Sequence, residues 1–462
     1  MHEMMNSTQR RTTTLGIALC TLGAIVMLAS PSRAANNLTP GFKGIDVVQI
    51  DGLIDPPNAS LLLDAIHDAE TDGSTALILQ LDSAGVVDTD PLRLANAIRD
   101  AEVPIVVWIG DAGAEARGGS AVVAAAAPML SMASNATIGP IGPLRLDDNA
   151  AVSVESFASL PTDPSRTGAL SAIRTKTIGA KSALTSKLAD SVEPVIGELI
   201  VGLDGKTIET ASGPKKLSTA EVKGSGNKAR REPNQPVRFR KLSLTGQLQH
   251  TLGAPWAAYF LFALGAALLL FEFFTISVGI AGVVGAVCVA FSAFGFSHLP
   301  VRGWAVGLLT LAFFGFGVDV QAGGFGPWTA IGTGSFVAGS LALYGGSSEL
   351  DPAWWIIILV CIGVALFMLA GMTAMLRSRF STPTVGREGM IGELGLASTD
   401  INPDGLITLR ETVWKARTNR ATPLRMGESA RVVAVEGLVL EVEPEAGGAK
   451  DYRDRGGPPA EP

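Results

Sequence analysis

LLLFEFFTISVGIAGVVG at residues 268–285 and FGFGVDVQAGGFGPWTAIG at residues 314–332 lie in a nearly uncharged region, residues 256–376. Apolar runs of this length predict helices that cross a lipid bilayer. Each quoted segment contains one acid, Glu272 or Asp319. The region divides the chain into a portion that precedes the membrane and a portion that follows it.

The two segments form an internal repeat of about 47 residues, a length typical of a duplicated structural unit. Aligning Glu272 with Asp319 also aligns Gly279 with Gly326 and Gly285 with Gly332. We therefore predict two related hairpin-like units. For the acids, two interpretations stay open: an ion path, or a structural role at a span end where the carboxylate caps the neighbouring segment. The matching positions favour the structural role.

Membrane spans are predicted at 256–273, 275–296, 303–320, 328–345 and 354–376. The fourth is rich in Gly and Ser, so we expect four to five transmembrane helices, with the fourth as a candidate re-entrant segment. Five crossings place the two soluble portions on opposite sides. Basic residues soon after the last span favour a cytoplasmic C-terminus, and these are Arg377, Arg379 and Arg387.

The composition excludes several classes of protein. Charged residues make up 17% of the 462 residues, whereas soluble domains carry about 25%. The net charge of −7 comes without a large basic domain, so nucleic acid is not an expected partner. The three cysteines lie far apart and the four histidines lack ligand spacing. No disulfide framework, metal site or cofactor is predicted.

Residues 1–34 have the pattern of a secretory signal peptide. Arg10 and Arg11 precede an apolar run from Leu15 to Leu28, and small residues follow in SPSRA at 30–34. An uncleaved anchor is the alternative. Either form places the next domain outside the cytoplasmic membrane.

Residues 35–212 are predicted to form an α/β domain. Strand patterns at 44–51, 76–82 and 104–110 alternate with helical patterns at 57–70 and 90–101. This order predicts a parallel sheet with right-handed crossovers. Residues 213–255 are basic and contain Gly, Pro and Asn. We interpret them as a solvated linker whose end contacts lipid headgroups.

Residues 386–444 alternate short strand patterns with turns, which predicts a small antiparallel barrel of about five strands. Trp414 is the only aromatic residue in this region. Nucleic-acid binding on such a barrel needs stacking aromatics and a basic groove, so contact with a protein is expected. Residues 445–462 are rich in Gly, Pro and charge, which predicts a disordered tail.

Residues with chemical potential follow two strands of the α/β domain. Strand 76–82 ends in Leu81-Asp-Ser-Ala-Gly85, whose amides, including that of Gly85, are candidates for part of an oxyanion hole. Strand 104–110 leads through GDAGAEARGGSAVV at 110–123 into a small-residue helix. A nucleophile such as Ser120 can stand there beside backbone amides. A closely packed helix without chemistry is the alternative.

These parts together resemble the long form of the nodulation-efficiency (NfeD) family. The resemblance covers about residues 44–444 and is strongest in GREGMIGELG at 386–395 and VEGLVLEVEP at 435–444. It implies a multi-domain protein with an α/β ClpP/crotonase-like, serine-protease-class domain, an α-helical transmembrane bundle and a C-terminal OB-like barrel. It further implies a homo-oligomer and a stomatin- or flotillin-like membrane protein as partner.

Active members of the family use a serine–lysine dyad, and the resemblance places Ser120 at the serine position through Ala116-Arg-Gly-Gly-Ser120. Counting back without gaps from Ala136-Thr-Ile-Gly139 gives Gly118 instead. The region of the family lysine holds Arg166 and no lysine, and arginine cannot deprotonate to act as the base. The family's glycine pair is also altered, at Ala84-Gly85-Val86.

The leading prediction is a multi-pass scaffold of the cell membrane. Its extracytoplasmic domain is a degenerate serine protease, and its cytoplasmic barrel binds a membrane-associated partner. Whether the chain is an enzyme stays open. One alternative is an active membrane-bound protease that uses Ser120 and a displaced lysine. Another is an ion-coupled transporter that uses Glu272 and Asp319.

Overall fold

The computed structural model describes residues 41–147, 166–223, 230–274, 279–322, 326–345, 348–372, 374–375, 387–419 and 422–445. The predicted signal peptide and nearly all of the predicted tail lie outside these residues. The chain divides into two compact units, residues 1–374 and 375–462, and each is described by itself.

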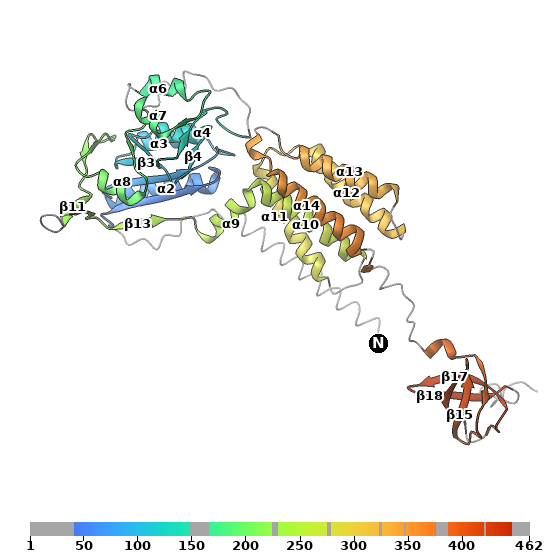
Figure 1. The fold of residues 1–462 in the computed structure, drawn as a ribbon. Coiled ribbons are helices and arrows are strands. Elements are labelled where there is room, and N and C mark those ends of the chain that lie inside the picture. Colours follow the sequence, from blue (N-terminus) through green and yellow to red (C-terminus); the bar gives the residue numbers. More distant parts are fainter. Residues whose placement is uncertain are drawn as a thin grey trace, which may run out of the picture. The chain divides into compact units, whose positions relative to one another are not determined.

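The α/β domain, drawn in blue to green in Figure 1, has a central sheet. This sheet has six strands in the order β13–β1–β2–β3–β5–β8. Every neighbouring pair is parallel, as predicted for the first three strands. Parallel strands are covered on both faces, and β3 is accordingly buried along its whole length. The strands are β1 (Ile45–Asp51), β2 (Ala76–Asp82), β3 (Ile105–Ile109), β5 (Met129–Met132), β8 (Ser191–Val192) and β13 (Val237–Arg240).

Helices connect these strands. The crossovers near the candidate site are α2 (Pro56–Asp72), α3 (Pro91–Arg99) and α4 (Gly119–Ala125). Asp55 and Asp90 cap α2 and α3 by accepting the amides of Asn58 and Leu92. The later helices are α6 (Arg166–Ala172), α7 (Ala180–Thr185), α8 (Ile196–Gly202) and α9 (Leu244–Gly253).

Short strands complete the domain. A three-stranded sheet contains β4 (Glu115–Ala116), β6 (Thr137–Ile138) and β7 (Ile178–Gly179). Two hairpins pair β9 (Thr207–Ile208) with β10 (Lys215–Lys216), and β11 (Ala220–Lys223) with β12 (Arg230–Pro233).

The segment predicted as a linker, 213–255, differs from that prediction. It contains β10 to β13 and α9, and β13 pairs with β1 along Ile45–Val48. The α/β sheet therefore extends to Arg240 and does not end near residue 212. The basic charge of the segment suggested a solvated linker, but Val237-Arg-Phe-Arg240 forms a strand whose two arginines bind buried Asp46.

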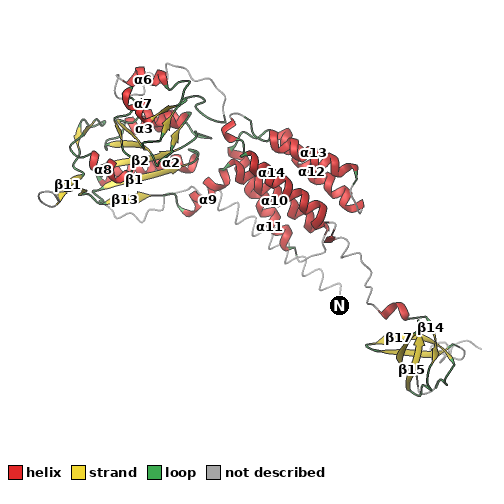
Figure 2. Cartoon of the chain, in the orientation of Figure 1, coloured by secondary structure: helices red, strands yellow, loops and turns green. Residues whose placement is uncertain are grey.

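Figure 2 draws the helices of the membrane region in red. Among the described residues of this region, four helices are long and apolar enough to cross a bilayer. They are α10 (Pro255–Phe274), α11 (Ile280–His298), α12 (Gly303–Ala322) and the segment Trp354–Met372, which begins as α14 (Trp354–Leu366) and continues as a π-helix (Phe367–Met372). The fourth predicted span, 328–345, corresponds to α13 (Pro327–Ala342), which has 16 residues. At 1.5 Å per residue α13 is about 24 Å long, shorter than a typical hydrocarbon core.

The sequence repeat is also a repeat of contacts. A Cβ atom on Gly285 in α11 would lie 2.9 Å from the carbonyl oxygen of Gly265 in α10. A Cβ on Gly332 in α13 would lie 2.9 Å from that of Ala312 in α12. Ala312 and Gly332 thus lie one repeat length, 47 residues, after Gly265 and Gly285. Small residues at equivalent positions thus bring each helix pair into close backbone contact.

The unit after the membrane region contains a closed barrel in the order β14–β15–β16–β18–β17. Its strands are β14 (Leu394–Ala397), β15 (Asp404–Leu409), β16 (Thr412–Arg417), β17 (Ser429–Glu436) and β18 (Val439–Pro444). The five-stranded prediction is confirmed. The purely antiparallel prediction is wrong, because β16 and β18 pair in parallel to close the barrel.

Candidate functional site

Two loops at the carboxyl ends of neighbouring strands define the candidate site. One is the loop after β2, residues 83–87, and the other follows β3 and leads into α4. Ser83 forms a parallel bridge with Ala116, which brings the loops together. Ligands of open α/β sheets bind at this edge, so the sequence-predicted serine and glycine lie where a site is expected.

Ser120 is in the first turn of α4 and is completely buried. Its hydroxyl can donate to the carbonyl oxygen of Ser83 at 2.8 Å and to that of Arg117 at 2.7 Å. It also accepts a hydrogen bond from the Arg117 amide at 2.9 Å. All three partners are backbone groups. Within the described part of the chain, no lysine amine hydrogen bonds to this hydroxyl.

The amide of Gly85 already has a partner. It donates to the hydroxyl of Ser83 at 3.3 Å, and that hydroxyl in turn donates to the Gly85 carbonyl at 3.0 Å. The amide of Gly118, just before α4, donates to the carbonyl of Pro140 at 2.7 Å. In this conformation neither amide is available to stabilise an oxyanion.

Arg166 lies away from Ser120. Its guanidinium donates to the carbonyls of Ala127 and Pro128, which follow the other end of α4, and pairs with Asp190. The side chain is buried. These contacts anchor α6 against the sheet, so the structure does not bring Arg166 together with the candidate serine. The sequence carried no signal for these carbonyl contacts.

The two intramembrane acids each bond to the start of the helix that follows. Asp319 in α12 accepts the amides of Gly326 and Thr329 and the Thr329 hydroxyl, at 2.8, 2.5 and 2.7 Å. Glu272 in α10 accepts the amide of Gly282 at 3.3 Å. The N-cap residues of these helices are Gly279 and Gly326, which have no side-chain acceptor. Each acid therefore supplies, from the preceding helix, the acceptor that an N-cap side chain usually provides.

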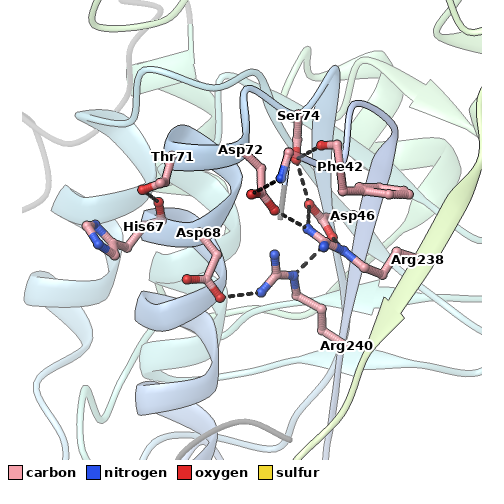
Figure 3. A network of polar contacts seen from close by, with 10 residues as sticks. Phe42, Asp46, His67, Asp68, Thr71, Asp72, Ser74, Arg238 and Arg240 are labelled. Carbon is pink, nitrogen blue, oxygen red and sulfur yellow. Dashed lines mark hydrogen bonds and ion pairs between the residues drawn. The ribbon is translucent and has the colours of Figure 1, made fainter. Parts of the chain in front are cut away.

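A buried ionic network surrounds Asp46 (Figure 3), and it was not predicted from the sequence. The Asp46 carboxylate in β1 receives Nε of Arg238 at 2.6 Å and Nε of Arg240 at 3.0 Å, both from β13. Arg240 also reaches Asp68, and Arg238 reaches Asp72, both on α2 (Figure 3). Burial opposes ionisation of Asp46, but the hydrogen bonds from the two arginines and Ser74 lower the pKa of its carboxyl.

A second missed contact joins α9 to α2. His250 Nδ1 lies 2.8 Å from Oδ2 of Asp55, the residue that caps α2. The hydrogen bond with Asp55 raises the pKa of the His250 imidazole, and partial burial opposes that rise. A lone histidine followed by an apolar run carries no sequence signal for this partner. Among the described residues no group of three or more His, Cys, Asp or Glu side chains could hold a metal ion.

Two family models match this chain, one over the membrane region and one over the barrel that follows it. Residues 256–374 match the model of the NfeD integral membrane domain, and residues 387–444 match the NfeD-like C-terminal, partner-binding domain. A membrane-bound protease of Pyrococcus horikoshii is 25% identical over 453 residues, covering 94% of this chain and 99% of the relative.

Solved structures are also similar. A membrane-bound stomatin-specific protease variant in complex with a substrate peptide is 20% identical, covers 45% of this chain and 96% of its own, and has a TM-score of 0.38. The C-terminal domain of a stomatin operon partner protein of Pyrococcus horikoshii is 40% identical over 14% of this chain and 98% of its own, with a TM-score of 0.13.

Proposed function

This chain is an integral membrane protein of the NfeD family, and from that premise we propose that it is a membrane scaffold whose α/β domain has lost proteolysis. The α/β domain has a protease-like fold, and the relative from Pyrococcus horikoshii is a membrane-bound protease. The proposal therefore assigns binding and assembly to a fold that elsewhere carries catalysis.

The state of Ser120 supports this proposal most directly. A serine nucleophile needs a base within hydrogen-bond reach, but the Ser120 hydroxyl bonds to backbone groups of Ser83 and Arg117. The nearest match to the family base, Arg166, is always protonated and is held at the other end of α4. The arrangement stabilises the turn before α4, and within the described residues the hydrogen bonds of the Ser120 hydroxyl lead to backbone groups and to no side chain that could take its proton.

Labelling with a fluorophosphonate tests the loss of proteolysis. The full chain in detergent and its Ser120→Ala variant are treated with the reagent, with a known serine hydrolase added to verify the reagent. We expect equal, background labelling of both proteins. Labelling that Ser120→Ala abolishes would overturn the proposal in favour of an active protease.

For the barrel we propose a protein partner embedded in or attached to the membrane. The matched C-terminal family domain is described as partner-binding, and the family resemblance implies a stomatin- or flotillin-like protein. The barrel strands contain one aromatic residue, Trp414, which offers no series of stacking platforms for bases. A homo-oligomer stays a prediction of the family resemblance.

We further propose that the α/β domain is extracytoplasmic and the barrel cytoplasmic. Arginines 377, 379 and 387 follow the last span, which favours a cytoplasmic C-terminus. Single cysteines at the exposed positions Ser212 and Thr412 test this orientation with a membrane-impermeant maleimide. We expect Ser212→Cys to react in spheroplasts and Thr412→Cys to react only after permeabilisation. The opposite pattern would reverse the orientation.

A further inference from the structure

Residues 140–147, here called the strap, cross the candidate site between its two loops. At one end the Pro140 carbonyl accepts the Gly118 amide at 2.7 Å, and at the other the Leu146 amide donates to the Val86 carbonyl at 2.8 Å. On its other side Val86 forms a parallel bridge with Ile54. A main-chain hydrogen bond thus joins the end of the strap to a residue that is itself bridged to Ile54.

The floor under the strap consists of glycines that let a backbone approach closely. A Cβ atom on Gly119 would lie 2.2 Å from the carbonyl oxygen of Leu144. A Cβ on Gly118 would lie 2.6 Å from that of Pro143. No side chain fits at either position while the strap is in place, so this surface is shaped to receive a main chain.

One apolar side chain anchors the strap. Leu146 is 1% exposed, and a Cβ atom on Gly85 would lie 2.8 Å from its Cδ1. It therefore fills the space beside the glycine that was predicted for the oxyanion hole. On either side of it the chain is polar, because Arg145 and Asp147 form an ion pair and Asp147 accepts the amide of Asp88 at 3.3 Å.

We propose that the strap is an intramolecular occupant of a peptide groove, and that the groove binds an extended peptide with a leucine-like side chain when the strap leaves. The groove supplies the Val86 carbonyl and the Gly118 amide as main-chain partners, and the space beside Gly85 as a side-chain pocket. Main-chain bonds give such a groove affinity, and the pocket gives it selectivity.

The covalent link explains why the groove is filled by its own chain. A tethered strand competes at an effective concentration in the millimolar range, so a free peptide of similar affinity is excluded from the intact protein. Weakening the strap removes this advantage without altering the groove. The strap sequence itself, PIGPLRLD, is therefore the natural probe.

The test measures fluorescence anisotropy of a labelled PIGPLRLD peptide with the full chain in detergent. Leu146→Asn weakens the strap, and Leu184→Asn, at a leucine 44% exposed on α7, is the matched control. We expect Leu146→Asn to bind the peptide at least about tenfold more tightly than wild type or Leu184→Asn, by removing the tethered competitor. A probe with its second leucine replaced by asparagine is expected not to bind.

A second variant guards against misfolding of Leu146→Asn. The double substitution Arg145→Ala with Asp147→Ala removes the ion pair at the strap and leaves Leu146 unchanged. We expect it to tighten peptide binding about threefold, since exposed ion pairs contribute little. Equal binding by wild type and both variants, including no binding by any of them, would overturn the strap proposal.

The outcome is separable from the proposed loss of proteolysis. Fluorophosphonate labelling of Leu146→Asn reports whether Ser120 reacts once the strap is weakened, and the scaffold proposal predicts background labelling there as well. Labelling that depends on Ser120 would overturn the scaffold proposal and leave the groove intact. Unchanged peptide binding would overturn the groove and leave the scaffold proposal standing.

Discussion

Asp46 in the α/β domain and Asp319 in the membrane region are both buried acids, and the protein satisfies them in different ways. Asp46 is fully buried and accepts hydrogen bonds from two guanidinium groups of β13. These arginines lie about 190 residues later in the sequence, and the entropy cost of closing such a loop grows only slowly with its length. Asp319 is 4% exposed and receives backbone amides from the turn and helix directly after it.

The two acids join different parts of the structure. Asp46 closes the domain, because its partners attach the last strand of the sheet to the first. Asp319 joins only α12 to the start of α13, because its partners Gly326 and Thr329 lie within the same repeat. The interior of a bilayer has no water that could bond to these amides in its place. Asp46 therefore stabilises a long-range contact and Asp319 a local one. The substitutions below test this contrast.

The largest effect is expected for Asp46→Asn. The substitution removes the carboxylate that Arg238 and Arg240 share, while Asp72 and Asp68 remain as their separate partners. Breaking this buried pair destabilises the protein by about 3 kcal/mol. Denaturation of the full chain in detergent, followed by tryptophan fluorescence, measures the loss. The control is Asp100→Asn, at an exposed pair with Arg99. Equal effects of both substitutions would refute the closing role of Asp46.

The Asp46 contribution also depends on pH. Its carboxyl has a lowered pKa in the folded protein, so its stabilisation is present above the unfolded value of about 3.9 and is lost as pH falls through the folded value. Acid titration of stability should therefore be less steep for Asp46→Asn than for wild type. Parallel acid profiles would contradict this assignment.

A smaller effect is expected for Asp319→Ala. The substitution removes an acceptor from the amides of Gly326 and Thr329 and destabilises the start of α13 by about 1 to 3 kcal/mol. Thermal unfolding in detergent, followed by tryptophan fluorescence, measures the change. Asp319→Asn keeps one acceptor oxygen and should lose clearly less. If both variants lose equally, charge and not capping is the important property.

His250→Gln tests a third buried acid, Asp55, whose partner titrates. Because the His250 pKa is raised on folding, its stabilisation is complete below about 6.5, the unfolded value, and disappears as pH rises through the folded value. The difference in melting temperature between wild type and variant should shrink from pH 6 to pH 9. A difference that is constant or grows with pH would disprove the ion pair.

The smallest effect is expected for Glu272→Gln. Glutamine retains an oxygen that can accept the Gly282 amide, so the loss of stability should stay below about 0.5 kcal/mol. The same variant examines transport, because a carboxylate in an ion path is required for flux. Proton-coupled flux in vesicles that disappears in Glu272→Gln would replace the capping role with a transport role.

Much of the fold follows from patterns within short windows. The β3 segment is apolar throughout and β2 is apolar except at Gln80 and Asp82, a pattern that marks buried parallel strands. The glycines of the membrane repeat match in sequence and in contact. The candidate site was predictable to the level of its two loops. The contact between the Ser120 hydroxyl and the Ser83 carbonyl was not, because it joins two loops that the bridge between Ser83 and Ala116 brings together.

The membrane helices, the alternation of strand and helix, the barrel and the duplicated hairpin could all be predicted from local sequence patterns. These follow from hydrophobic periodicity, which the solvent imposes on each segment separately. Only the tertiary structure decided that β13 completes the sheet, that Arg166 lies far from Ser120, and that the strap fills the groove beside Gly85. Each of these depends on contacts between distant parts of the chain, and residue type alone does not specify which distant partner a buried charge or a main-chain group will meet.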